Sequence, residues 1–179
     1  MKGEQIVRDW LKDQGFLVVP TSLIENGGAP ALEGFLQRHV LPDNLAFKDG
    51  QGRWVEVKTK SKPTLHRNTN TWEHGLAFRL WCAYREVEEK TKLPGWLAVV
   101  EIESGYLLLA PMAQLAERGR IYMGKGMPDG LPHIFFPRLA FDWYEDGRVL
   151  KINGLAPQAP RTIEQPQAPT TRQLELWSD

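Results

Sequence analysis

The sequence has little cysteine and no surplus of charge of either sign. Its one cysteine, Cys82, excludes an internal disulfide and has no second thiol with which to build a zinc site. Lysine plus arginine and aspartate plus glutamate number 22 each, so the formal net charge is zero, which argues against a uniformly basic nucleic-acid coat. We expect a buried structural role for Cys82 and a reducing, cytoplasmic location.

Long apolar runs are also missing. No run reaches the length that spans a membrane, and we expect no signal peptide before the first helix. Hydrophobic residues make up 42% and charged residues 25% of the 179 residues, both ordinary for a globular protein. The chain is long enough for one domain with a substantial core, and we expect no membrane partner.

The most informative stretch of the sequence is a predicted β-hairpin. Residues 43–48 and 53–60 are apolar enough to form two strands. Between them, Asp49-Gly50 is a dipeptide typical of tight hairpin turns. Because side chains alternate along a strand, Glu56 and Lys58 share one face of the second strand.

The length of the turn decides where Asp43 lies in this hairpin. A two-residue turn places Asp43 opposite Glu56, and a four-residue loop places it opposite Lys58. In both registers the three side chains share one face, whereas a three-residue loop would turn Asp43 away. The hairpin therefore predicts two acids and a lysine close together in space.

Two neighbouring carboxylates repel each other unless a positive charge lies between them. Carboxylate oxygens suit Mg²⁺ or Mn²⁺, which keep several waters and accept phosphate oxygens. Such an ion polarises a phosphate and lowers the pKa of bound water. Lys58 would then lie beside the attacking water or the developing charge. The arrangement predicts a divalent metal site next to a phosphodiester.

These residues resemble the PD-(D/E)xK nuclease superfamily. Pro42-Asp43 matches the first part of the motif, and Glu56-Val57-Lys58 matches the second. The resemblance implies metal-dependent phosphodiester hydrolysis, with Asp43 and Glu56 as metal ligands and Lys58 as the catalytic lysine. It also implies an α/β (α+β) restriction-endonuclease-like fold with an αβββαβ core, which would cover residues 2–110. An ordinary exposed hairpin with charged residues is the alternative.

Glu4 is a further candidate metal ligand. Members of the superfamily, archaeal Holliday-junction resolvases among them, carry an acid on the first helix, which we expect at residues 2–15. Glu4 lies on the helix face of Val7 and Leu11 by its spacing. Alternatively, the acid simply favours the helix dipole. Between Glu4 and Asp43 the chain is longer than in compact resolvases, with the surplus near residues 25–30.

A basic segment follows the predicted hairpin. We expect residues 61–74 to form an exposed loop, and a long helix to follow at 75–91. Residues 58–67 contain no acid, and local positive charge is what phosphate contacts require. The candidate DNA-binding residues are Lys60, Lys62, His66, Arg67 and, at the start of the helix, His74. Alternatively, residues 58–67 form an ordinary solvated loop, and His74 is a helix cap or an exposed ring.

The remaining expected elements are assigned from apolar periodicity and turn residues. They are a strand at 16–19, a short helix at 31–38, strands at 96–102 and 106–110, a helix at 111–118, and strands at 133–136, 138–144 and 148–152. Residues 119–153 would form a small β-rich extension of a nuclease domain spanning 1–153, or alternatively a dimer surface.

The C-terminal segment changes composition. Residues 154–171 are rich in proline, glutamine, alanine and threonine, which predicts a flexible linker. Residues 172–179 contain Gln173-Leu174-Glu175-Leu176-Trp177, which resembles the peptide that binds the bacterial sliding β-clamp. The resemblance implies a hydrogen bond from Gln173 and apolar contacts from Leu174, Leu176 and Trp177. A tail folded onto its own domain, or a dimer contact, is the alternative.

Three functions remain in competition. The first is a DNA endonuclease that uses Mg²⁺ or Mn²⁺ and is recruited to the clamp for DNA repair, recombination or replication, near the nucleoid. The second is a Holliday-junction resolvase, which would act as a homodimer. The third is a non-catalytic module that binds nucleic acid or protein.

Overall fold

The fold is taken from a computed structural model, which describes residues 2–24, 31–34, 37–67, 69–123, 127 and 130–144. The expected strand at 148–152, the linker at 154–171 and the clamp-like peptide at 172–179 lie outside the described residues. Those expectations stay predictions.

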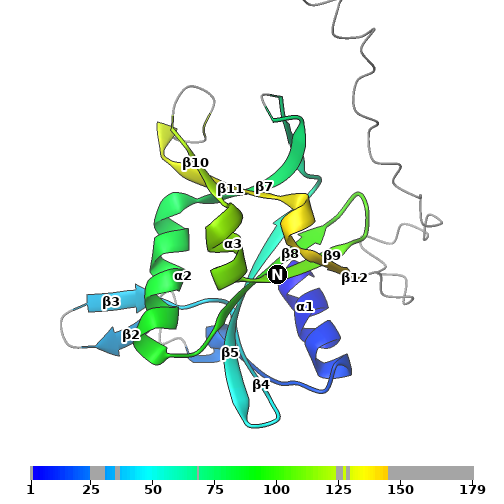
Figure 1. Cartoon of the computed structure of the whole chain (residues 1–179). Helices are drawn as coiled ribbons and strands as arrows, with labels where there is room; N and C mark the ends of the chain where they lie inside the picture. Colours follow the sequence, from blue (N-terminus) through cyan, green and yellow to red (C-terminus); the bar gives the residue numbers. More distant parts are fainter. Residues whose placement is uncertain are drawn as a thin grey trace, which may run out of the picture.

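The centre of the molecule is a six-stranded sheet (Figure 1). Its spatial order is β1 (Leu17–Pro20), β4 (Asn44–Lys48), β5 (Gln51–Lys60), β8 (Gly95–Glu101), β9 (Leu107–Pro111) and β12 (Asp142–Tyr144). Only β5 and β8 run parallel among these neighbours, and the long helix connects them. The longest strand, β5, therefore lies inside the sheet with partners on both sides.

Helices cover both faces of this sheet. Helix α1 (Lys2–Asp13) buries Val7 and Leu11, one turn apart, against Val55 and Val57 of β5. Helix α2 (Phe78–Thr91) and helix α3 (Met112–Arg118) bury their apolar sides in two further clusters. Because alternate residues of β5 face opposite sides of the sheet, Trp54 points away from α1 and packs in one cluster with Val87 of α2. Glu56 and Lys58 therefore point to the α2 side.

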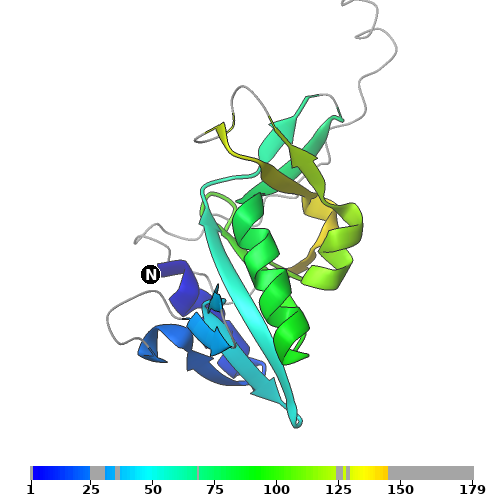
Figure 2. The same cartoon turned by 90° about the vertical axis from the view of Figure 1, so that its left-hand side faces the viewer.

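A second sheet lies across the ends of α2 and α3 (Figure 2). Its order is β10 (Arg120–Tyr122), β11 (His133–Pro137), β7 (Thr71–Ala77) and β6 (Thr64–His66). Leu76, Ile134 and Phe136 on its inner face join the core formed with α2 and α3. A two-stranded hairpin, β2 (Ala31–Gly34) and β3 (Gln37–Val40), and two 3-10 helices, η1 (Thr21–Ile24) and η3 (Arg138–Ala140), complete the described elements.

For the strands of the large sheet and the helices that cover it, the structure confirms the expected helix–strand–strand–strand–helix–strand order as α1, β1, β4, β5, α2 and β8, with β2–β3 and β6–β7 inserted between these elements. The helix expected at 31–38 was wrong, since β2 and β3 occupy those positions. The loop expected at 61–74 was also wrong, because β6 and β7 pair there and β7 pairs with β11. The long helix consequently begins at Phe78. Pairing with strands elsewhere in the chain therefore makes residues 64–66 and 71–74 parts of strands, although their polar sequence is typical of a loop.

Cys82 is exposed, contrary to the expectation of a buried thiol. Helix α2 turns Trp81, Tyr84 and Val87 inward, and their spacing leaves Cys82 on the outward side. Among the helices of the described ranges, none has the length and apolar character needed to cross a membrane.

Candidate active site

The turn between β4 and β5 fixes the register of the two acids. Asp49 and Gly50 have φ angles of 51° and 74°, which a two-residue hairpin turn of the I′ type requires. Lys48 pairs with Gln51, and Asn44 pairs with Val55. One step further along this register, Asp43 is level with Glu56. The structure therefore has the two-residue alternative, and the four-residue loop is excluded.

Asp43 lies immediately before β4 and is tied to the neighbouring strand. Its Oδ2 accepts a hydrogen bond of 2.8 Å from the backbone N–H of Val57. The backbone around it is also held, since Thr21 donates to the carbonyl oxygens of Pro42 and Asp43. Burial raises the pKa of Asp43, and the negative charge of Glu4 adds to this, against the lowering by Val57 and Lys58.

Glu56 is almost completely buried on the α2 side of the sheet. Only 2% of the residue is exposed, and its Oε1 accepts a hydrogen bond of 2.8 Å from the hydroxyl of Tyr84. The same oxygen forms an ion pair with Lys58. Burial raises the pKa of Glu56 to about 7, and Asp43 adds to the rise, although Lys58 and Tyr84 oppose it. The lysine therefore does not fully offset the effect of burial on this acid.

Lys58 lies at the open side of this cluster. Its ammonium is 5.7 Å from the centre of the Tyr84 ring, and about a quarter of its side chain is exposed. Burial, followed by repulsion from Lys58, lowers the pKa of Lys60, two residues further along β5. Two cations thus follow the buried acid along one face of the strand.

Glu4 reaches the same region from α1. Gly3 is packed so closely on β5 that a Cβ atom there would lie 1.9 Å from Oγ1 of Thr59. Glu4 forms an ion pair of 3.5 Å with Arg8, and its charge acts on Asp43. The structure therefore brings Asp43, Glu56 and Lys58 together, and Glu4 lies near enough to Asp43 for its charge to act on that acid.

These acids do not form a closed metal cage. Within the part of the chain that the structure describes, no group of three or more His, Cys, Asp or Glu side chains is arranged to hold an ion. Asp43 and Glu56 still supply the hard oxygen atoms that Mg²⁺ or Mn²⁺ prefers, and this ion type usually completes its coordination with water and phosphate. Burial is the main cause of both raised pKa values, so the two carboxylates are poorly stabilised in their ionised form without a bound cation. The donor set fits a divalent ion held by few protein ligands.

The candidate DNA-binding residues have different surroundings. Lys62 and Arg67 are exposed, and Lys60 and His66 are half-buried. His66 stacks against Tyr122, with ring centroids 4.5 Å apart. The prediction for His74 needs correction: it lies in β7, not at a helix start, and is 3% exposed. Its Nε2 is 2.7 Å from Oε1 of Glu101, so this placement does not support a phosphate contact.

Tyr84 is the functional candidate that sequence reasoning missed. It is 4% exposed and lies with Trp81 and Val87 on the buried side of α2. Burial, followed by the charge of Glu56, raises the pKa of Tyr84, so its hydroxyl stays protonated and donates to Glu56. A buried tyrosine hydroxyl needs a polar partner, and a buried acid on the facing strand is one that could have been inferred.

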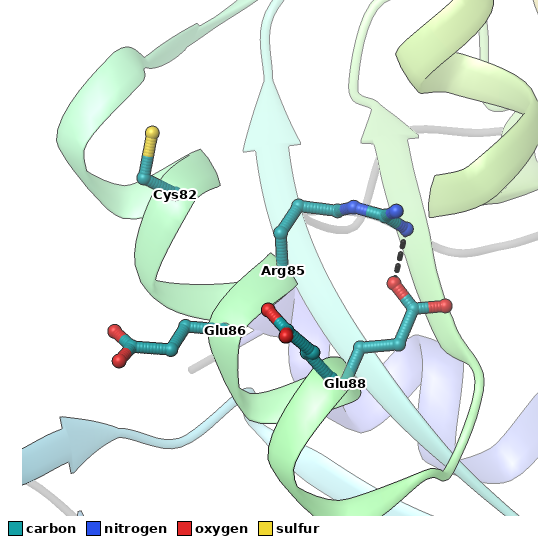
Figure 3. A pocket seen from close by; sticks show the side chains of 5 residues that line it. Cys82, Arg85, Glu86 and Glu88 are labelled. Carbon is teal, nitrogen blue, oxygen red and sulfur yellow. Dashed lines mark hydrogen bonds and ion pairs between the residues drawn. The ribbon is translucent and has the colours of Figure 1, made fainter.

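A shallow hollow on α2 lies apart from these residues (Figure 3). It is lined by Cys82, Arg85, Glu86, Glu88 and Glu89, and Arg85 forms an ion pair with Glu88. Three acids against one arginine give this surface the wrong charge for a phosphate. We assign it no part in the chemistry.

Comparison with solved structures relates the fold to a known nuclease. The Holliday junction resolvase Hjc from the archaeal hyperthermophile Archaeoglobus fulgidus matches with a TM-score of 0.50 and 10% sequence identity, over 78% of this chain and 89% of that one. The chain has the restriction-endonuclease-like fold. A nuclease from a fusselovirus matches with a TM-score of 0.41 and 8% identity, over 78% of this chain and 79% of that one. Comparison with protein-family models and with curated proteins gave no match.

Proposed function

We propose that the protein is a metal-dependent endonuclease that hydrolyses phosphodiester bonds in DNA. The observation that carries this proposal is the convergence of Asp43, Glu56 and Lys58 on adjoining strands of a restriction-endonuclease-like fold. A buried acid and a half-buried acid beside a lysine are costly for a fold, because each charge loses hydration as it is removed from water. Such a cluster is therefore a strong candidate for a functional site.

Asp43 and Glu56 would hold Mg²⁺ or Mn²⁺, with Glu4 contributing from α1. When bound, such an ion supplies Lewis-acid activation of the phosphate and of a water. Glu56 must lose its proton before it can act as a ligand, and its pKa of about 7 places that step near neutral pH. Lys58, released from its ion pair with Glu56, would stabilise the negative charge that develops on the phosphate.

The test is cleavage of labelled DNA by matched variants that remove charge with little change in shape. Asp43→Asn, Glu56→Gln and Lys58→Met should each lower Mn²⁺-dependent cleavage by at least about a hundredfold, as expected for loss of transition-state charge stabilisation. Asp49→Asn is the control, because it removes an acid from the same hairpin at a position where asparagine accepts positive φ. Cleavage by the three site variants at the wild-type rate would overturn the proposal.

A Holliday-junction resolvase is the second candidate. It is supported by the fold similarity to Hjc and by exposed apolar side chains at one edge of the large sheet. There, Leu17 and Val19 of edge strand β1 and Phe47 of β4 are 76%, 40% and 37% exposed. A resolvase needs two copies related by symmetry across the junction. Light scattering that detects only a monomer on four-way junction DNA would exclude this candidate.

The incomplete metal cage favours a third candidate, a module that binds nucleic acid or protein without cleaving. Among the described residues the acids do not already surround one point. Under this alternative Asp43 and Glu56 would serve the fold alone. Calorimetric titration with Mn²⁺ separates the two: a bound ion supports the nuclease, and no binding supports the module.

The C-terminal peptide adds a proposal about location. Gln173, Leu174, Leu176 and Trp177 would dock on a sliding clamp and bring the nuclease to DNA under repair, recombination or replication, near the nucleoid in the cytoplasm. The match of these residues to the clamp-binding pattern supports this proposal. Deletion of residues 172–179 should abolish clamp binding and keep cleavage of free DNA. Clamp affinity unchanged by the deletion would contradict it.

A further inference from the structure

The hairpin formed by β6 and β7 begins close to the candidate active site. Strand β5 carries Glu56 and Lys58 and ends at Lys60, and β6 starts only four residues later at Thr64. The hairpin belongs to the second sheet, which lies at one end of the molecule in both views (Figures 1 and 2). A DNA strand that reaches Lys58 therefore has this hairpin within reach.

One face of the hairpin is fastened to the rest of the second sheet. Arg120 of β10 donates a hydrogen bond of 3.1 Å to Oγ1 of Thr71 and forms an ion pair with Glu73. On the same side, the ring of His66 stacks on Tyr122 of β10. The hairpin is therefore held from outside its own two strands.

The turn of the hairpin is also braced. Oγ1 of Thr69 lies 3.0 Å from Nδ1 of His66 and 2.6 Å from Oγ1 of Thr71. These contacts link the turn to both strands. The position of the hairpin is thus set before any ligand arrives, which lowers the entropic cost of binding.

The opposite face of the hairpin carries an uncovered apolar pair. Leu65 and Trp72 are direct cross-strand partners, and they are 39% and 38% exposed. Further along β7 on this face, His74 and Leu76 are buried. Leu65 and Trp72 therefore lie on the same face of the sheet as the buried residues, but at a point where the described helices and strands leave that face partly exposed. A tryptophan on a braced hairpin, with part of its ring in solvent, is suited to stacking on another flat group.

The charge around this pair favours an anionic ligand. From residue 58 to residue 72 the chain contains three lysines and one arginine and no acid, and Lys62 and Arg67 are exposed. An exposed acid, Glu103, borders the segment through a hydrogen bond of 2.9 Å from its N–H to the carbonyl of Ser61. Phosphates beside Lys62 and Arg67, with a flat ring against Trp72, describe a nucleic-acid strand whose bases are unstacked. A regular duplex offers phosphates but keeps its base faces stacked.

We infer that Trp72 and Leu65 form a stacking platform for unpaired nucleobases, and that the substrate is DNA with a single-stranded segment next to a duplex. The inference rests on the proposed nuclease function and names its substrate class. It adds two contact residues that the basic segment alone does not indicate.

The test is equilibrium binding in EDTA, where cleavage cannot occur. Fluorescence anisotropy would compare a duplex that ends in a single-stranded arm with a blunt duplex of equal length. Trp72→Ala should weaken binding to the armed DNA by about tenfold, in the range found for loss of one base–aromatic stack, and leave the blunt duplex unchanged. Trp72→Phe should retain most of the affinity. Leu139→Ala, which truncates an exposed apolar side chain of η3 outside the β6–β7 hairpin, is the control.

The outcomes are distinguishable. Equal losses on both DNAs would mean that Trp72 contacts duplex, and unchanged affinity would mean that it contacts no DNA; either result overturns the inference. Thermal melting of each variant excludes unfolding as the cause. Mn²⁺-dependent cleavage by the same preparations is a separate readout. If wild-type protein cleaves nothing but the selective loss persists, the nuclease proposal fails and the stacking platform stands.

Discussion

The hydroxyl of Tyr84 on α2 donates a hydrogen bond of 2.8 Å to Oε1 of Glu56 on β5, the same oxygen that pairs with Lys58. A core residue of the helix therefore touches the candidate metal ligand directly. This hydrogen bond favours the ionised form of Glu56 and opposes the effect of burial on its pKa.

Tyr84→Phe should shift the pH dependence of cleavage. Without the hydroxyl, the pKa of Glu56 rises further, so less of the carboxylate is ionised at neutral pH. We expect cleavage to fall by about tenfold at pH 7, consistent with the loss of a hydrogen bond to a charged group, and to recover toward the wild-type rate at higher pH. A pH–rate profile measures this. A uniform loss at every pH would mean that Tyr84 acts on packing alone.

The control for this variant is Tyr144→Phe. Tyr144 belongs to β12, and its ring lies 4.7 Å from that of Trp10 on the α1 side of the sheet. This variant also removes one tyrosine hydroxyl, but β12 is separated from β5, which carries Glu56, by strands β8 and β9. Its profile should match that of the wild type.

The metal-free protein should lose stability as the pH rises toward 7. The folded pKa of Glu56 is about 7, above its ordinary value of 4.5. Between these values the folded state keeps a proton that the unfolded state has released. The free energy of unfolding therefore falls with increasing pH, by up to about 1.4 kcal/mol per pH unit from this group, and levels off above 7.

Urea unfolding in EDTA across this pH range checks the expectation. Glu56→Gln should show a shallower dependence than the wild type, because the amide does not titrate. Asp43 contributes in the same direction, so part of the slope should remain in the variant. Identical slopes for the wild type and the variant would contradict the raised pKa of Glu56.

Glu101 is expected to be the most sensitive acid for folding. It is fully buried and receives hydrogen bonds of 2.7 and 2.6 Å from Arg138 and contacts His74. Burial alone would raise its pKa, but these partners and Ser104 lower it to about 2. Glu101→Gln should cost about 3–5 kcal/mol, because it leaves Arg138 buried without its counter-charge.

Chemical denaturation measures this cost, with Glu103→Gln as the exposed control, which should change stability by less than about 0.5 kcal/mol. In the wild type the contribution of Glu101 is fully present above its ordinary pKa of 4.5 and is lost as the pH falls toward 2. A cost below about 1 kcal/mol for Glu101→Gln would show that the cluster is dispensable.

Gly3→Ala should weaken metal binding by displacing Glu4. A Cβ at residue 3 would collide with Oγ1 of Thr59, so α1 must move away from β5. Adding Thr59→Ala removes the colliding oxygen and should restore part of the affinity. Calorimetry with Mn²⁺ measures both variants. Wild-type affinity in Gly3→Ala would mean that the position of Glu4 does not matter for the ion.

The hairpin that carries the candidate site was predictable because residues close together in sequence determine its turn and the faces of its strands. The Asp49-Gly50 pair restricts the turn, and strand alternation then places Glu56 and Lys58 on one face. Sequence reasoning left two registers open for Asp43, and the positive φ angles of the turn decided between them. The core order of helices and strands followed from periodicity in the same way.

The errors concern residues whose partners are far away in sequence. His74 was expected at a helix start, but pairing of β7 with β11 makes it a strand residue that contacts Glu101, the partner of Arg138. The hydrogen bond from Tyr84 to Glu56 spans two elements in the same way. Local pattern does not by itself name the partner in such pairs, because the packing of α2 on β5 and the order of strands in the second sheet decide which residues meet.

The most direct test of the account is calorimetric titration of Mn²⁺ into the wild type, Asp43→Asn and Glu56→Gln at pH 8, above the pKa of Glu56. If Asp43 and Glu56 hold the ion, we expect saturable binding by the wild type and at least tenfold weaker binding by each variant, since each variant loses a charged ligand. No binding by the wild type, or equal binding by all three proteins, would contradict it.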